Sequence, residues 1–90
     1  MKLTPIQVMD ALRHNNIFTL KADAEYQVGI ENSQIVISKR GSDIAYLGNT
    51  LESAIQLRKI LKDHGTKEQQ NQINKALADL MILENEDEWK

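Results

Sequence analysis

Residues 43–61 place a strand, a tight corner and a helix in one continuous run. The start of the run is apolar and predicts a short strand. Gly48 and Asn49 follow, and both residue types tolerate the positive φ of a sharp turn. Thr50 stands where a helix N-cap is expected, because its hydroxyl can accept a hydrogen bond from a free backbone N–H of the first turn. This run therefore joins one strand to one helix through a very short connection.

The helix of this run, at about residues 51–63, is apolar over roughly 220° of its circumference when residues are projected at 100° intervals. Burial against one sheet face needs about half that arc. We therefore expect this helix to be covered on two sides, by a sheet and by another helix. Gly65 is the expected C′ residue at its end. Its apolar positions are Leu51, Ala54, Ile55, Leu57, Ile60 and Leu61.

Local patterns predict the remaining elements. A first helix over about 5–14 opens at Thr4-Pro5, which suits an N-cap followed by the first helical position. Alternating strands over 26–31 and 34–39 meet at the turn Asn32-Ser33, and a last helix over about 67–83 follows Thr66. The apolar run 17–20 is either the start of a strand or a buried connection.

These elements predict an α+β fold: a helix, a three-stranded antiparallel meander and two C-terminal helices. The first two helices would cover one face of the sheet, and the third would pack on the second. We expect residues 1–83 to form a single domain. Residues 84–90 would form a frayed acidic tail, because carboxylates are repelled by a helix C-terminus.

The overall charge is nearly balanced but unevenly distributed. The formal net charge is −2, with +1 in residues 1–66 and −3 in residues 67–90. Nucleic-acid-binding domains usually show a clear basic excess on one face. The chain has no cysteine, no leading apolar run and no apolar stretch near the roughly 20 residues that span a bilayer. We therefore expect a cytoplasmic protein without a membrane segment.

No catalytic or metal-binding pattern stands out. His14 and His64 both fall at predicted helix ends, where a surface or capping role is expected. They lack the spacing of a metal site, the four glycines are far apart, and the serines occupy turn, strand and first-turn positions. We expect a protein that is not an enzyme and that binds neither a metal nor a cofactor.

Two groups of basic residues are candidates for phosphate contact. Lys39 and Arg40 lie at a predicted hairpin tip, and Arg58, Lys59 and Lys62 lie on the second helix. A solvated turn and a solvated helix edge are the alternative interpretation of these groups.

The acidic C-terminal end is a candidate contact for another protein. It consists of carboxylates beside one tryptophan, and a single buried tryptophan can dominate an interface. A solubilising end is the alternative interpretation. The candidate contact residues are Glu84, Glu86, Asp87, Glu88 and Trp89.

The order Tyr46-Leu47-Gly48-Asn49-Thr50, followed by Glu52 and Ala54, resembles the AP2-type DNA-binding domain and the arm-binding domains of phage integrases over about residues 26–62. Those families place three antiparallel strands in the DNA major groove, with Arg and Trp on the exposed face of the sheet. The resemblance implies DNA contacts at Gln34, Ser38 and Lys39 or Arg40. The sequence departs from the family pattern because the exposed side of the first strand would carry Glu25, Gln27, Gly29 and Glu31.

The layout is also similar to that of small phage anti-CRISPR proteins, which are far more acidic. The double-stranded-RNA-binding domain has a similar order of elements. It carries a Lys pair where this chain has Thr50-Leu51-Glu52.

We therefore predict a small non-catalytic binding module for an unknown protein partner, encoded by a phage or mobile element. The alternative is a weak AP2-like DNA-binding module that uses the sheet and the Lys39-Arg40 hairpin. Ile82 and Leu83 widen the apolar stripe of the last helix. The protein is accordingly expected to be either a monomer or a homodimer through helix 67–83.

Overall fold

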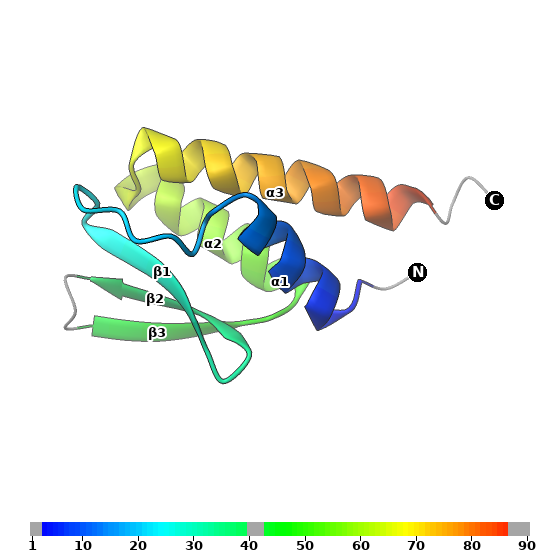
Figure 1. The fold of residues 1–90 in the computed structure, drawn as a ribbon, viewed down its shortest axis with the longest axis horizontal. Coiled ribbons are helices and arrows are strands. Elements are labelled where there is room, and N and C mark those ends of the chain that lie inside the picture. Colours follow the sequence, from blue (N-terminus) through cyan, green and yellow to red (C-terminus); the bar gives the residue numbers. More distant parts are fainter. Residues whose placement is uncertain (1–2, 40–42, 87–90) are drawn as a thin grey trace.

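A computed structural model describes residues 3–39 and 43–86. The described chain forms a helix, a three-stranded antiparallel sheet and two further helices, which confirms the predicted α+β fold (Figure 1). The elements are α1 (Pro5–His14), β1 (Tyr26–Glu31), β2 (Gln34–Lys39), β3 (Asp43–Gly48), α2 (Leu51–His64) and α3 (Lys67–Glu86).

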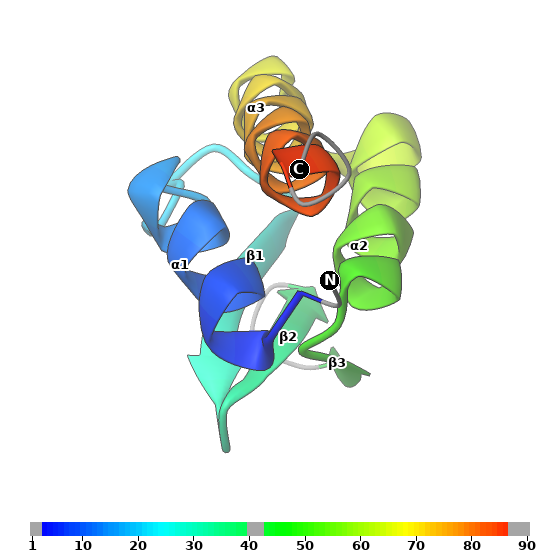
Figure 2. The same cartoon turned by 90° about the vertical axis from the view of Figure 1, so that its right-hand side faces the viewer.

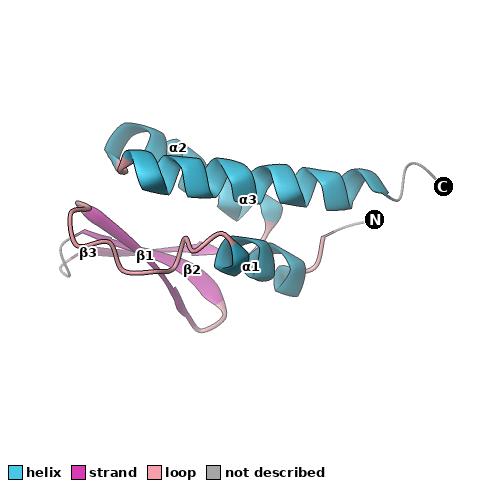
Figure 3. Ribbon diagram, turned by 45° about the horizontal axis from the view of Figure 1, so that its top comes forward, coloured by secondary structure: helices cyan, strands magenta, loops and turns pink. Residues whose placement is uncertain are grey.

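The helices are stacked on one side of the sheet. The strand order is β1-β2-β3, and α1 and α2 lie beside each other on one face, with α3 above both (Figure 2). The view in Figure 3 shows the other face of the sheet turned away from all three helices. α3 packs on α2 as predicted, and it also packs on α1. Asn15 Nδ2 donates a 3.1 Å hydrogen bond to Asp79 Oδ2 and joins the end of α1 to α3.

The core lies between the sheet and the helices. β1 contributes Val28, and β2 contributes Ile35 and Ile37. α2 contacts both β3 and α3, and Leu57 and Leu61 are completely buried, as its wide apolar arc predicts. Ala54 of α2 and Ile17 of the loop after α1 also belong to this cluster. α1 and α3 contribute the buried side chains Val8, Met9, Ala11, Leu12, Ile73, Ala76 and Leu80.

Each of the three helices begins at a threonine that forms a reciprocal capping box. At α2, Ser53 N donates to Thr50 Oγ1 over 3.2 Å, and Thr50 N donates to Ser53 Oγ over 3.3 Å. Gln7 and Gln69 are the corresponding partners of Thr4 and Thr66. All three predicted N-caps are therefore confirmed.

The corner between β3 and α2 depends on a glycine. Gly48 has φ +97°, and a Cβ added there would lie 2.8 Å from Ser53 Oγ. The β1–β2 turn is also as predicted. Asn32 and Ser33 have φ of 53° and 59°, the paired positive values of a type I′ hairpin.

One local expectation differs from the structure. Gly65 has φ −86° and ψ 165°, so it is extended and not left-handed. A glycine fits there because an added Cβ would lie 2.7 Å from the carbonyl oxygen of Leu61. Of the two alternatives for the run 17–20, the structure has a connection and not a strand, with Ile17 buried and Leu20 exposed.

The last helix is longer than predicted. α3 continues to Glu86, three residues beyond the expected end at Leu83, so Glu84 belongs to the helix and not to a frayed tail. Leu83 packs against the core and holds the last turns in place despite the acidic residues near the helix C-terminus. The tail prediction for Asp87, Glu88 and Trp89 lies outside the described residues.

Candidate functional site

The outer face of the sheet, turned away from the helices, is unusually apolar. The register pairs Val36 with Gly29 on one side and with Tyr46 on the other, and Ser38 with Ile44. Strand alternation therefore places Val36, Ile44 and Tyr46 on the outer face. An antiparallel sheet with one covered face normally turns polar side chains to solvent on the other. Here Ile44 and Tyr46 remain 55% and 50% exposed.

The loop between α1 and β1 extends this apolar surface. Phe18 and Leu20 line a depression of about 350 Å³ together with Gly29, Val36 and Ile44. Leu20 is 78% exposed, and nothing lies within 4 Å of the position that a Cβ on Gly29 would take. We call Phe18, Leu20, Val36, Ile44 and Tyr46 the outer-face patch.

Hydrogen bonds hold the loop beside β1. Lys21 N donates to Gln27 Oε1 over 3.0 Å, and Gln27 Nε2 donates to the Lys21 carbonyl. The buried Lys21 side chain turns back into the loop, where its Nζ donates to the Asn16 carbonyl over 3.0 Å. Asn16 itself has φ 61°, one of the positions at which the chain leaves α1. Leu20 is thus carried on an anchored segment.

Glu31 is the charged residue among the described strand positions that face outward beside the patch. A hydrogen bond with the Glu31 side chain raises the pKa of Tyr46 above its usual value of 10.0, and desolvation and the negative charge of Glu31 add to that rise. The neutral phenol is therefore favoured.

The sequence analysis did not identify the residues of the outer-face patch as a site. The available signal was β3 itself, which is apolar at four consecutive positions, Ile44 to Leu47, although it is an edge strand. Alternation alone could not say which pair faced the core. The pairing with β2 decides it, because it places Ala45 opposite the inward-facing Ile37.

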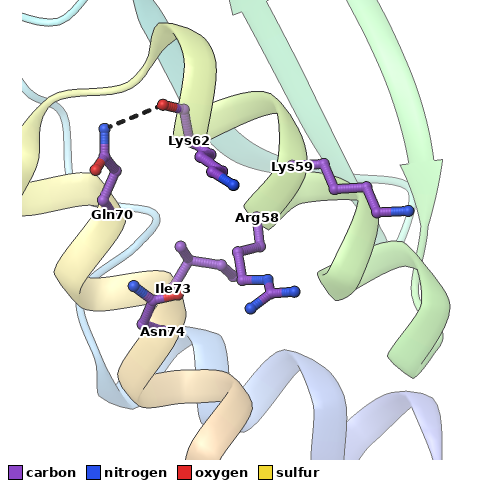
Figure 4. A pocket seen from close by; sticks show the side chains of 6 residues that line it. All are labelled: Arg58, Lys59, Lys62, Gln70, Ile73 and Asn74. Atoms are coloured by element: carbon purple, nitrogen blue, oxygen red, sulfur yellow. Dashed lines mark hydrogen bonds between the residues drawn. The ribbon is translucent and has the colours of Figure 1, made fainter.

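A second candidate surface is the basic groove, which we define as the hollow of about 450 Å³ between α2 and α3. The structure brings together the three predicted helix cations in its lining. In Figure 4, Arg58 extends beside Ile73 and Asn74, whereas Lys59 points away from α3. The lining residues are Arg58, Lys59, Lys62, Gln70, Ile73 and Asn74.

The other predicted DNA contacts are not brought together. Gln34 and Ser38 lie on the outer face, whereas Lys39 lies on the opposite face, where its register partner is Tyr26. Lys39 Nζ is 3.3 Å from Glu25 Oε1 and 5.9 Å from the centre of the Tyr26 ring. Lys39 does not line the basic groove, and Arg40 lies outside the described residues.

The predicted acidic contact set is described only in part. Glu84 is partly buried in the last turn of α3, and the backbone of Glu86 ends that helix. Asp87, Glu88 and Trp89 lie outside the described residues.

The histidines take ordinary helix-end positions. His14 and His64 are exposed, and the His64 ring lies 5.3 Å from the ring of Tyr26. Within residues 3–39 and 43–86, no three His, Cys, Asp or Glu side chains are grouped as a metal site would require. In the same part of the chain, no helix combines the length and the apolar character needed to cross a membrane.

Comparison with known protein families, with curated proteins and with solved structures gives no match for this chain. A function is therefore argued from the outer-face patch and the basic groove, both built from described residues.

Proposed function

We propose that this protein is a non-catalytic module that binds another protein through the outer-face patch. The observation that supports it is the exposure of Leu20, Ile44 and Tyr46 on the one sheet face that no helix covers. Contiguous exposed apolar surface with a polar rim marks interaction sites on soluble proteins. Around this patch, Gln27, Glu31 and Ser38 supply the rim.

The patch has features of a protein interface. Tyrosine is enriched at the centres of interfaces, and burial of apolar area contributes about 25 cal/mol per Å². The open space above Gly29 gives a partner side chain a place to enter between Leu20, Val36 and Ile44. A partner with an apolar projection and a hydrogen-bond donor or cation opposite Glu31 would complement this surface.

The alternative, an AP2-like module that reads DNA with its sheet, has less support. The outward positions of the described strands include Gln27, Glu31, Gln34 and Ser38, and none of these positions carries a Lys or Arg. DNA affinity depends mainly on cations that contact phosphates. The predicted helix cations gather in the basic groove, which lies between α2 and α3 and not on the sheet.

The test compares partner capture by three immobilised proteins. Cell lysate is passed over the wild type, over the pair Ile44→Ser and Tyr46→Ser, and over the control Ile6→Ser. Ile6 is a 73% exposed apolar residue of α1 that does not line the outer-face depression. We expect specific proteins to be retained by the wild type and the control and lost from the double variant. Equal capture by all three would contradict the proposal.

The DNA alternative is tested separately by retention on duplex DNA at rising salt. Phosphate contact predicts tight binding at low salt that weakens steeply as salt increases. Retention that disappears with Ile44→Ser and Tyr46→Ser but does not depend on salt would not fit phosphate contact.

A further inference from the structure

The basic groove contains cations that the fold does not use. Within residues 3–39 and 43–86, the side chains of Arg58, Lys59 and Lys62 form no ion pair or hydrogen bond. The groove also contains two amide side chains, and Gln70 Nε2 donates to the backbone carbonyls of Gly65 and, over 3.5 Å, of Lys62. This is a surface with unused positive charge beside hydrogen-bonding groups.

The character of the groove changes along α3. Gln70, Asn74, Leu77 and Met81 follow one another at spacings of four, three and four residues, so they lie on one side of the helix. The first two are polar and lie opposite the cations, whereas Met81 is apolar and 49% exposed. A ligand that fits this line carries negative charge at one end and apolar groups at the other.

The chain itself contains a segment of that composition. Residues 84–90 carry four carboxylates and the one tryptophan of the protein, directly after the apolar residues Met81, Ile82 and Leu83. We propose that the basic groove binds the acidic segment 84–90 of a second copy of this chain.

The segment cannot reach the groove of its own chain. Twelve residues separate Asn74 from Glu86, and α3 rises about 18 Å over that distance. Residues 87–90 span at most about 14 Å when fully extended. α3 also runs away from the groove towards its C-terminus, as Figure 1 shows. The contact therefore forms between two molecules.

A two-fold axis near Leu80 lets the acidic segment of each copy meet the basic groove of the other. Antiparallel α3 helices paired about that point place the end of α3 in one copy, at Glu86, beside Asn74 of the other, so that the acidic segment begins at the groove of its partner copy. The same pairing brings together Met81 and Ile82, which is 61% exposed, from both chains. A two-fold interface repeats every contact and closes as a dimer. This arrangement corresponds to the expected homodimer through helix 67–83.

The groove favours carboxylates on a peptide over a nucleic-acid backbone. Its cations are few, and they lie beside the apolar side chain of Ile73. The chain has a net charge of −2 and so offers a polyanion no long-range attraction, whereas a short acidic segment presents its charge only at the groove.

The first test measures molecular mass by sedimentation equilibrium over a wide range of protein concentration. We expect a monomer–dimer equilibrium that weakens when salt rises from about 50 mM to about 500 mM, because the paired charges are exposed. Arg58→Glu with Lys62→Glu should weaken dimerisation by about tenfold or more, as should Glu86→Lys with Asp87→Lys and Glu88→Lys. Combining both sets in one chain should restore it, because the charges are then exchanged.

Arg13→Glu is the matched control for Arg58→Glu. It makes the same change of charge at an exposed α1 residue outside the groove and should leave dimerisation unchanged. A labelled synthetic peptide with the sequence of residues 84–90 is the direct probe. It should bind the wild-type protein at low salt and compete with dimerisation.

Three results would overturn the proposal. The first is a monomer at every concentration together with no binding of the peptide. The second is a dimer that both charge-reversed sets leave intact. The third is a protein that stays monomeric while its Arg58 and Lys62 bind a short DNA duplex, which would assign the groove to nucleic acid. Circular dichroism of each variant shows whether the helices are retained.

Discussion

Ile35 and Ile37 of β2 point into the core, whereas Val36 between them points to the outer face of the same sheet. All three are apolar, and their positions differ in which side of the strand they occupy. The inner face is covered by three helices, and among the described residues the outer face meets the loop that carries Phe18 and Leu20. Val36 is only 8% exposed, so both faces of β2 are packed, and the apolar surface left for a partner lies at Leu20, Ile44 and Tyr46.

Truncating a side chain on each face should separate these roles most clearly. Ile35 is completely buried, so Ile35→Ala should lower the free energy of unfolding by about 2–5 kcal/mol. Ile44→Ala on the outer face should change it by less than about 0.5 kcal/mol. Urea unfolding followed by circular dichroism measures both.

The loss expected for Ile35→Ala is comparable with the whole stability of a small domain. If that variant is unfolded, Ile35→Val keeps the comparison measurable, with an expected cost of about 0.5–1.5 kcal/mol. Equal costs for Ile35→Val and Ile44→Val would mean that the outer face is as important for folding as the core.

The core and the outer face can also be compared through two polar side chains, those of Gln69 and Gln27. Gln69 is completely buried, and its Nε2 donates to the Tyr26 carbonyl over 2.8 Å while its Oε1 accepts from Thr66 N. Gln69→Ala leaves both backbone groups unpaired and should cost about 1–3 kcal/mol. Gln27→Ala should cost less, because it frees a surface loop.

The second glutamine should matter more for binding than for folding. Loss of the Gln27 contacts to Lys21 should release the segment that carries Leu20, so partner capture should fall while the unfolding midpoint stays nearly constant. A Gln27→Ala variant that loses as much stability as Gln69→Ala would show that the loop is part of the core.

A pair of glycines extends the comparison to the backbone. Gly48 has a positive φ and lies close to Ser53, so Gly48→Ala should cost about 1–2 kcal/mol. Gly29 has open space above it on the outer face, and Gly29→Ala should stabilise the strand by about 0.5–1 kcal/mol. The same Gly29 variant should reduce partner capture if the depression receives a side chain. A stabilised Gly29→Ala that captures normally would place the contact elsewhere on the face.

The sequence predicts most of the fold because its signals are local. Thr4, Thr50 and Thr66 mark the start of each helix, and Asn32-Ser33 marks the hairpin through its backbone preference. The end of α2 at Gly65 was predicted, but the conformation of Gly65 was not. Gly65 is extended, and a close contact with Leu61 one turn earlier in the same helix requires a glycine there.

The candidate site was harder to predict, for the same reason. Arg58, Lys59 and Lys62 meet because they follow helical spacing, which the sequence contains. The outer-face patch instead joins a loop residue, Leu20, to β3 residues more than twenty positions away in the chain. Only the strand register and the path of the loop bring these together, and no local pattern encodes either.

The smallest effect concerns the ionisation of the outer face itself. The hydrogen bond to Glu31 raises the pKa of Tyr46, so Glu31→Gln should return that pKa towards 10.0. The absorbance of the phenolate during an alkaline titration measures the change, and Tyr46→Phe identifies the transition that belongs to Tyr46.

The direction of the shift also fixes its effect on stability. A folded-state pKa above the unfolded value means that folding favours the neutral phenol. The stability that this preference gives the folded state is therefore fully present below the unfolded pKa, near pH 10. It is lost as the pH rises through the higher folded-state pKa, and Glu31→Gln should remove this loss. A titration that Glu31→Gln leaves unchanged would mean that Glu31 does not stabilise the neutral phenol of Tyr46 on the outer face.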